Sequence, residues 1–109
     1  MVYVPDRADV VWLHFTPQAG HEQAGHRLAL VLSPKRYNQV TGLMLCCPLT
    51  TAVKGYPFEV ATQVGGKPGV VLADQVKSLD WQARKAKKAA EVEAEVFAEV
   101  VAKLQTLLG

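Results

Sequence analysis

Turn-forming residues divide the first 76 residues of this 109-residue chain into five short apolar segments. Each segment is rich in Val, Leu or aromatic residues, which favour β-strands, and is bounded by residues that favour turns. The expected strands cover residues 10–15, 28–33, 43–50, 56–62 and 70–76. The sequence therefore predicts a fold built mainly from short strands.

The pattern changes at residue 89. Apolar residues at positions 92, 96, 97, 100, 101, 104, 107 and 108 recur every three or four residues, which predicts one amphipathic helix over 89–109 that ends at Gly109. Four glutamates lie in its N-terminal half, where the helix dipole favours negative charge. We expect one domain over residues 1–109, mainly β with a C-terminal helix (α+β), in which the helix caps a small β-barrel.

Two prolines interrupt the strand pattern. Residues 33–42 begin with Ser-Pro and end with Thr-Gly, so we expect a loop there, with one helical turn as the alternative. Pro48 lacks an N–H, so the expected strand 43–50 should carry a bulge or run along an edge at that position.

The charge is divided unevenly along the chain. Residues 1–88 hold eleven Lys or Arg and six Asp or Glu, whereas residues 89–109 hold one Lys and four Glu. A basic body is compatible with a polyanionic partner without requiring one. No apolar run approaches the ~20 residues of a membrane span, and the first residues lack the pattern of a signal peptide. We therefore expect a cytoplasmic protein without membrane association.

The two cysteines, Cys46 and Cys47, are neighbours in an expected strand. Adjacent strand residues point to opposite faces, so a disulfide between them is not expected, and two thiols alone do not make a zinc motif. We expect both to be buried and to pack as small apolar residues.

The stretch QAGHEQAGHR, residues 18–27, holds the densest group of polar functional residues. A zinc motif of this kind needs two histidines four residues apart on a helix. His21 and His26 are five apart, and the glycines between and beside them exclude a helix. His14, on the preceding expected strand, could supply a third ligand, but we do not expect a metal site. Arg27, where the loop becomes a strand, suits a phosphate ligand, and Thr50, Thr51 and Lys54 could add further phosphate contacts. A solvated surface loop and a phosphate-binding site both remain open on these grounds.

Several short blocks resemble, in identity and order, those of the MazF/PemK family of toxin–antitoxin ribonucleases. They read D-x-V-W, EQAGHR, VLSP, YN, TT, KGYPFEV and ADQVKS, and the resemblance covers essentially the whole chain. It implies an SH3-like β-barrel, usually a homodimer, that cleaves single-stranded RNA, mostly messenger RNA, at short sequence motifs without a metal or other cofactor. The expected products carry a 2′,3′-cyclic phosphate and a 5′-hydroxyl. The expected partner is an antitoxin whose acidic, largely unfolded tail blocks the RNA groove.

The resemblance also implies roles for individual residues. The catalytic arginine of the family matches Arg27, its catalytic threonine matches Thr50, and its functional loop glutamate matches Glu22. Arg27 would stabilise charge on the phosphate, Glu22 would act as a base or orient Arg27, and His26 is the candidate acid. The expected RNA-contacting residues are His14, Gln23, Thr51, Lys54, Gln75 and Lys77.

Three positions depart from the family pattern. Leu28 follows the catalytic arginine where the family commonly has proline, which frees φ and adds an N–H donor. His14 replaces an acidic residue and, if that residue reads a base, would change the RNA motif. Ala8 stands where glycine is usual, a difference that matters only if φ there is positive.

Two other functions remain as alternatives. A related toxin type has the same fold and poisons DNA gyrase without cleaving RNA, although the EQAGHR and TT blocks favour the ribonuclease. The other alternative is an inactive member of the family, with its site loosened at Leu28.

Among the remaining features, we expect Trp12, Phe15, Trp81 and the apolar stripe of the C-terminal helix to be core or dimer residues. The basic run 84–88 is either a solvated face or part of the RNA-binding charge.

Overall fold

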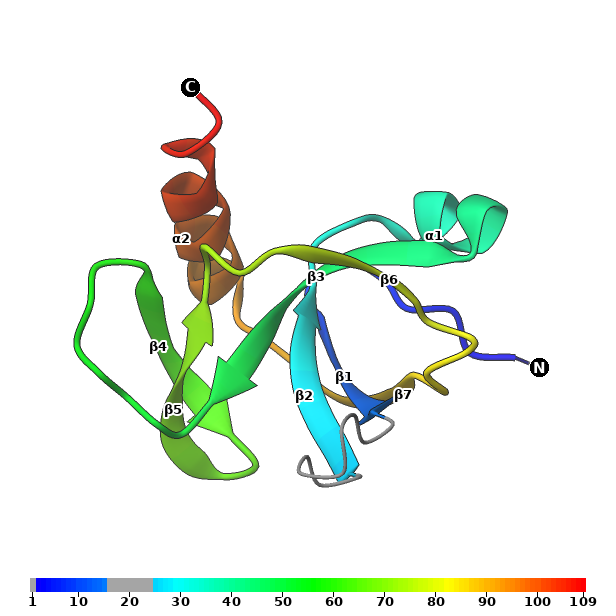
Figure 1. The fold of residues 1–109 in the computed structure, drawn as a ribbon, viewed down its shortest axis with the longest axis horizontal. Helices are drawn as coiled ribbons and strands as arrows, with labels where there is room; N and C mark the ends of the chain where they lie inside the picture. Colours follow the sequence, from blue (N-terminus) through cyan, green and yellow to red (C-terminus); the bar gives the residue numbers. More distant parts are fainter. Residues whose placement is uncertain (1, 16–24) are drawn as a thin grey trace, which may run out of the picture.

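The computed structural model describes residues 2–15 and 25–109, with the backbone alone at Phe15, Gly25 and His26. Within these residues, seven strands and two helices follow one another along the chain (Figure 1). They are β1 (Asp9–Phe15), β2 (Gly25–Val31), α1 (Lys35–Thr41), β3 (Leu43–Thr50), β4 (Glu59–Val64), β5 (Lys67–Leu72), β6 (Lys77–Asp80), β7 (Lys87–Glu91) and α2 (Ala94–Gln105). The expected mainly β fold with a C-terminal helix is confirmed.

The strands form one antiparallel sheet that curls into a half-barrel (Figure 1). Its order is β4-β5-β3-β2-β1-β7, and β6 pairs with β3 off this path. β3 is the central strand. One of its edges pairs with β2. Its other edge pairs with β6 over Leu43–Cys46 and then with β5 at Leu49 and Thr50. This change of neighbour bends the sheet around a concave face.

Pro48 lies where β3 passes from β6 to β5. The pairing with β2 runs in one register from Val31↔Cys46 to Ala29↔Pro48, so the proline causes no register shift there. On the other side, neither Cys47 nor Pro48 has a partner in the β6 or β5 ladders. The proline therefore sits at a local edge, one of the two expected arrangements, because a residue without an N–H removes no ladder bond there.

The two sides of the sheet bury separate apolar clusters. One contains Val10, Leu28, Leu30, Cys47, Leu49, Val60, Val71, Ala73 and Val100, and the other contains Val11, Leu13, Ala29, Val31, Met44, Cys46 and Trp81. Neighbouring residues of one strand alternate between the clusters, as the pleat requires. Cys46 and Cys47 are both buried and lie in different clusters, so the expectation that they are small packing residues is confirmed.

The sequence prediction missed two strands. β6 and β7 have the sequences KSLD and KKAAE, and most of their residues are exposed. Neither carries the apolar alternation that predicts a strand, and pairing with β3 and β1 determines their conformation instead. Residues 89–91 were expected in the helix, but they belong to β7. Lysines on the outer edge strand β7 also oppose pairing with other chains.

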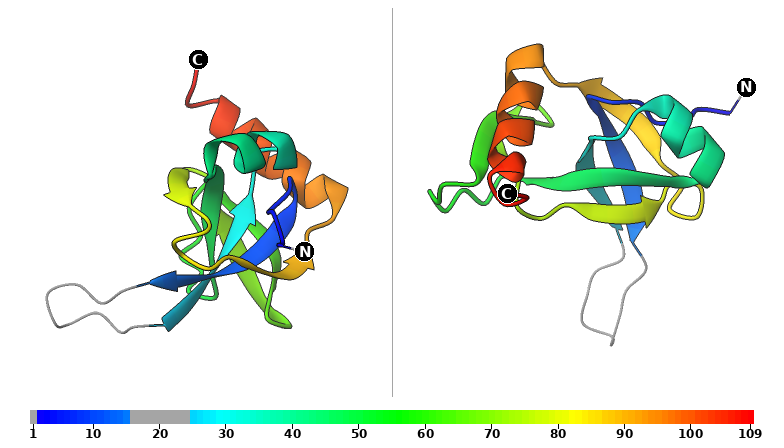
Figure 2. Two further views of the ribbon diagram at one scale, coloured as in Figure 1. Left: turned by 90° about the vertical axis from the view of Figure 1, so that its right-hand side faces the viewer. Right: turned by 90° about the horizontal axis from the view of Figure 1, so that it is seen from above.

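The C-terminal helix is shorter than expected, running from Ala94 to Gln105 rather than over 89–109. Before it, the N–H of Val92 donates to the carbonyl of Ala8, which keeps residue 92 in an extended segment. Val96, Phe97 and Val100 pack on the first apolar cluster. After Gln105 the chain continues in turns, with Leu107 and Leu108 exposed, so Gly109 does not end the helix. The right-hand view of Figure 2 shows α2 beside β4, with α1 at the opposite end of the molecule.

The segment expected as a loop contains the seven-residue helix α1, held by a fully buried Asn38. Its Nδ2 donates to the carbonyls of Pro5 (2.7 Å) and Ser33 (3.1 Å), and its Oδ1 accepts from the hydroxyl of Ser33 (2.6 Å). Its backbone carbonyl accepts the indole N–H of Trp81 at 2.8 Å. These hydrogen bonds, of which those to Pro5 and Trp81 are long-range, stabilise a helix that local propensity does not predict.

The aromatic residues have different environments. Trp81 is in the core as expected, whereas Trp12 is 37% exposed and lies outside it. Among the described helices, neither is long and apolar enough to cross a membrane.

Candidate active site

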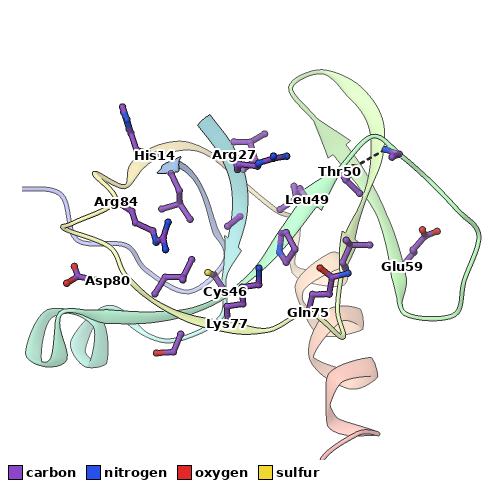
Figure 3. Close-up of a pocket in the computed structure, with 18 of the residues that line it drawn as sticks. His14, Arg27, Cys46, Leu49, Thr50, Glu59, Gln75, Lys77, Asp80 and Arg84 are labelled. Atoms are coloured by element: carbon purple, nitrogen blue, oxygen red, sulfur yellow. Dashed lines mark hydrogen bonds between the residues drawn. The ribbon is translucent and has the colours of Figure 1, made fainter. Parts of the chain in front are cut away.

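The concave face of the sheet holds a cleft of about 1050 Å³ between β2, the end of β3, β6 and the loops 51–58 and 80–84 (Figure 3). Six of the residues expected at the functional site line it. They are His14, Arg27, Thr50, Lys54, Gln75 and Lys77. The curled sheet thus gathers groups that lie as far as 63 positions apart in the sequence.

Arg27 and Thr50 come from the ends of two strands. Arg27 lies near the start of β2 and its side chain is exposed, and Figure 3 shows it extending toward the side of the cleft where Thr50 lies. Thr50 ends β3, and its Oγ1 accepts the backbone N–H of Ala52 at 3.0 Å. The hydroxyl proton is then left to donate to an anionic ligand.

Leu28, the residue after Arg27, is held by both its side chain and its backbone. Its side chain is buried in the first apolar cluster, and its backbone is paired with Trp12 in the β1–β2 ladder. Packing and strand pairing therefore hold the backbone next to Arg27, in place of the restriction of φ that a proline would impose. The leucine at position 28, where the family commonly has proline, leaves Arg27 on an ordered strand.

Positive charge dominates the described lining of the cleft. Four Lys or Arg side chains (Arg27, Lys54, Lys77 and Arg84) contribute to it, against two carboxylates, those of Glu59 and Asp80. The N–H groups of Lys54 and Gly55 bind the Glu59 carboxylate, at 2.9 and 2.8 Å. A cleft with this charge suits a polyanionic ligand.

The second carboxylate, that of Asp80, also binds backbone. Its Oδ1 accepts the N–H groups of Gln82 (3.0 Å) and Ala83 (2.9 Å), which holds the turn after β6. Both acids in the described lining therefore stabilise loops. This use argues against either of them as the general base.

Arg84 lines the cleft, whereas the sequence analysis named it only as one residue of the basic run 84–88. Its carbonyl accepts the backbone N–H of His14 (2.9 Å), and its own N–H donates to the Asp80 carbonyl (3.2 Å). Figure 3 shows its side chain directed into the cleft, on the side of Cys46 and Lys77.

The expected basic run 84–88 is thus divided between two places. Arg84 lines the cleft, whereas Lys87 and Lys88 lie on β7, where Lys88 pairs with Asp9 (3.5 Å) and Glu91 (2.6 Å). No pattern in the run distinguishes Arg84 from the lysines, because its carbonyl is bound by the N–H of His14 from a distant strand.

Tyr56 is a cleft residue that the sequence did not single out. Its hydroxyl donates to Oδ1 of Asp74 at 2.8 Å, and this hydrogen bond is the main cause of the raised pKa of Tyr56. The bond ties loop 51–58 to the segment that carries Gln75.

The thiols near the cleft are neutral at physiological pH. Burial raises the pKa of Cys46, on the cleft floor, to about 11, although the positive charges of Lys77 and Arg84 lower it. Burial also raises the pKa of Cys47 to about 12. A thiol of this kind is a poor nucleophile, so the described cleft offers no activated cysteine.

Four expected residues are not placed in the cleft. Glu22 and Gln23 lie outside the described residues, as does the His21 of the metal alternative, and so do the side-chain atoms of His26. The backbone of His26 pairs with His14 in the β1–β2 ladder. Thr51 is exposed and is not among the residues that line the cleft. In the part of the chain that the structure describes, no three His, Cys, Asp or Glu side chains gather as metal ligands would.

A small half-barrel whose concave face gathers cations around a strand-end arginine and threonine is the arrangement expected of a protein that binds a polyanion. Residues 6–108 match the family described as the PemK-like, MazF-like toxin of type II toxin–antitoxin systems, and the chain belongs to this family. The resemblance read from the sequence is thereby confirmed.

Relatives of known name agree with this assignment. The chain is 52% identical over 107 residues to the endoribonuclease toxin MazF of Escherichia coli K12, covering 98% of this chain and 96% of the relative. It is 37% identical to the endoribonuclease toxin ChpB of the same strain, over 94% of this chain and 93% of the relative. A chain in the crystal structure of MazE–MazF (Form-II) from Deinococcus radiodurans is 60% identical, with a TM-score of 0.92 and coverage of 99% and 98%.

Proposed function

We propose that this chain is the toxin of a type II toxin–antitoxin pair and cleaves single-stranded RNA, mostly messenger RNA, at a short sequence motif. The main support for this proposal is that Arg27 and Thr50 line one cleft together with Lys54, Lys77 and Arg84. Relatives at 37–52% identity are named endoribonuclease toxins, which favours this activity over a gyrase poison of the same fold.

The reaction is an in-line attack by a ribose 2′-hydroxyl on the adjacent phosphate. It yields a 2′,3′-cyclic phosphate and a 5′-hydroxyl and needs no metal, provided that side chains bind the charge and move the protons. Arg27 stabilises the negative charge that develops on the phosphate oxygens, and Thr50 donates its hydroxyl to one of them. DNA lacks the attacking hydroxyl, so the reaction is selective for RNA.

We assign proton transfer to Glu22 and His26, in and just after the segment 16–24. Glu59 and Asp80 are committed to backbone N–H groups, so Glu22 is the remaining candidate for the base or for orienting Arg27. His26, the second residue of β2, is the candidate acid because a histidine titrates near neutral pH. The other residues proposed to contact RNA are His14, Lys54, Gln75 and Lys77, which line the cleft, together with Thr51, which does not line it, and Gln23, which lies outside the described residues.

An antitoxin with an acidic, unfolded tail fits the same cleft, since its carboxylates would bind the cations that otherwise bind phosphates. A relative at 60% identity was crystallised as MazE–MazF. We also propose a homodimer, because Leu43, Leu45, Leu107 and Leu108 remain exposed on β3 and after α2. Messenger RNA as substrate places the protein in the cytoplasm.

The test is incubation of a long single-stranded RNA with the protein in EDTA. We expect cleavage by the wild type and its loss in Arg27→Ala, whereas Arg36→Ala, which removes an exposed arginine on α1 away from the cleft, should retain it. Full cleavage by Arg27→Ala would overturn the role of Arg27. Intact RNA together with gyrase-trapped DNA breaks would instead support the gyrase poison, and neither activity, with no growth arrest on expression, would indicate an inactive member.

A further inference from the structure

Loop 51–58 forms one wall of the cleft and carries Lys54. The loop has no regular secondary structure, and residues 51–55 are exposed. A lysine on such a loop binds a phosphate well only if the loop is held in one conformation, because ordering a flexible segment opposes binding. Phosphate binding by Lys54 therefore requires a group that fixes the backbone of the loop at Lys54.

Glu59, the first residue of β4, fixes the backbone at Lys54 and Gly55 through both of its carboxylate oxygens. Oε2 accepts the N–H of Lys54 at 2.9 Å and Oε1 accepts the N–H of Gly55 at 2.8 Å. Hydrogen bonds to an ionised acceptor are stronger than neutral ones. Gly55 has φ +84°, so the loop turns there in a conformation that other residues rarely adopt. The carboxylate thus holds one particular turn at Lys54.

The remainder of the loop is fastened by other groups. The hydroxyl of Tyr56 binds Asp74, and the ammonium of Lys103 on α2 donates to the carbonyls of Pro57 (2.5 Å) and Glu59 (3.3 Å). None of these bonds reaches the backbone of Lys54 or Gly55. Loss of the Glu59 carboxylate should therefore loosen Lys54 without releasing the rest of the loop.

We propose that Glu59 is a positioning residue that holds Lys54 at the cleft wall, where the ammonium binds a phosphate of the RNA. This inference rests on the proposed function. The simplest alternative treats Glu59 as a negative charge beside a polyanion, which would repel the RNA. The two accounts predict effects of opposite sign when the charge is removed.

The variant Glu59→Gln distinguishes them. Glutamine keeps the size of the side chain, but it removes the charge and replaces one acceptor oxygen with an NH₂ donor. Binding is measured by fluorescence anisotropy on an RNA of the mapped cleavage sequence that carries one 2′-deoxy sugar at the cleaved position, so that it is not cut. Positioning predicts binding about threefold to fivefold weaker and a salt slope shallower by about 0.7, the loss of one phosphate contact. Simple repulsion predicts tighter binding.

Steady-state cleavage adds a second readout. We expect the rise in KM to match the loss of binding and kcat to change less than about twofold, because Lys54 contacts a phosphate in the ground state and the transition state alike. Glu95→Gln, on the exposed face of α2, makes the same charge change away from the cleft and should leave KM unchanged. Circular dichroism melting checks that each variant is folded.

A double-mutant cycle tests whether Glu59 acts through Lys54. Lys54→Ala should weaken binding as much as Glu59→Gln does, and the double variant should bind no more weakly than Lys54→Ala alone. Additive losses, or tighter binding by Glu59→Gln, would overturn the inference.

Amide hydrogen exchange provides an arm that does not depend on RNA. The N–H groups of Lys54 and Gly55 should exchange faster in Glu59→Gln than in the wild type, and unchanged exchange would overturn the inference. A wild-type protein that neither binds nor cleaves RNA would instead overturn the proposed function, whatever the exchange shows.

Discussion

The hydroxyl oxygen of Thr50 accepts the backbone N–H of Ala52 at 3.0 Å, so one hydrogen bond fixes the atom that we propose donates to the phosphate. The bond uses an oxygen lone pair and leaves the proton for the cleft. The catalytic and turn-capping roles of this threonine are therefore compatible.

Thr50→Val tests this arrangement, because valine keeps the branched shape that suits β3 but has no hydroxyl. We expect kcat to fall by about 10²–10³, as when a donor to developing charge is removed. Thr50→Ser, which keeps the hydroxyl, should retain most of the rate. Single-turnover cleavage of one RNA by the three proteins checks this, and equal rates for Val and Ser would show that the hydroxyl takes no part.

Arg84 should contribute to RNA binding through its position opposite Arg27 and Thr50 in the cleft. We expect Arg84→Ala to weaken binding of single-stranded RNA and to reduce the salt slope by about 0.7. The matched control is Lys87→Ala, which removes an exposed cation from β7 outside the cleft. Equal salt slopes for the wild type and Arg84→Ala would contradict a phosphate contact at this residue.

Ala8 has φ 76°, in the left-handed region that favours glycine. It is the third residue of a turn in which the N–H of Asp9 donates to the Asp6 carbonyl at 3.0 Å, a position where glycine is often required. We expect Ala8→Gly to raise the free energy of unfolding by about 0.5–1 kcal/mol and the melting temperature by a few degrees. Ala29→Gly, in strand β2, should lower both, and a lower melting temperature for Ala8→Gly would contradict the strain.

The raised pKa values of the buried thiols predict their reactivity. Because the values of about 11 for Cys46 and about 12 for Cys47 exceed the ordinary 9.0, the neutral thiols contribute stability that is fully present below that value. This stability is lost as the pH rises through the folded pKa values. At about pH 8, iodoacetamide should leave both cysteines unmodified in the native protein but alkylate them in urea, as measured by mass spectrometry. Rapid alkylation of the native protein would contradict their burial.

The sequence predicts those parts of the fold that local pattern determines. Strands β1 to β3 follow apolar segments between turn residues, and the alternation that separates Cys46 from Cys47 follows from the pleat. The position of Ala8 could also be marked in advance, because the resemblance placed glycine there.

Other parts depend on contacts that no local pattern reveals. Helix α1 relies on the side chain of Asn38, whose partners Pro5 and Ser33 lie on different segments. β6 and β7 are strands because of their neighbours rather than their composition. In the cleft, the sequence named Arg27 and Thr50, but it included Arg84 only within the basic run 84–88. The backbone pairing of Arg84 with the distant His14, which positions this residue, leaves no mark in the local sequence.

Arg27 and Thr50 are proposed to stabilise the phosphate while the ribose 2′-hydroxyl attacks it. The direct measurement is to map the 5′ ends of fragments from a long RNA in EDTA, and then to synthesise the cut sequence with and without a 2′-deoxy sugar at the cleaved position. We expect cleavage of the all-ribose strand to a 2′,3′-cyclic phosphate and a 5′-hydroxyl, and no cleavage of the deoxy-substituted strand. Cleavage of both strands, or products with a 5′-phosphate, would contradict this mechanism.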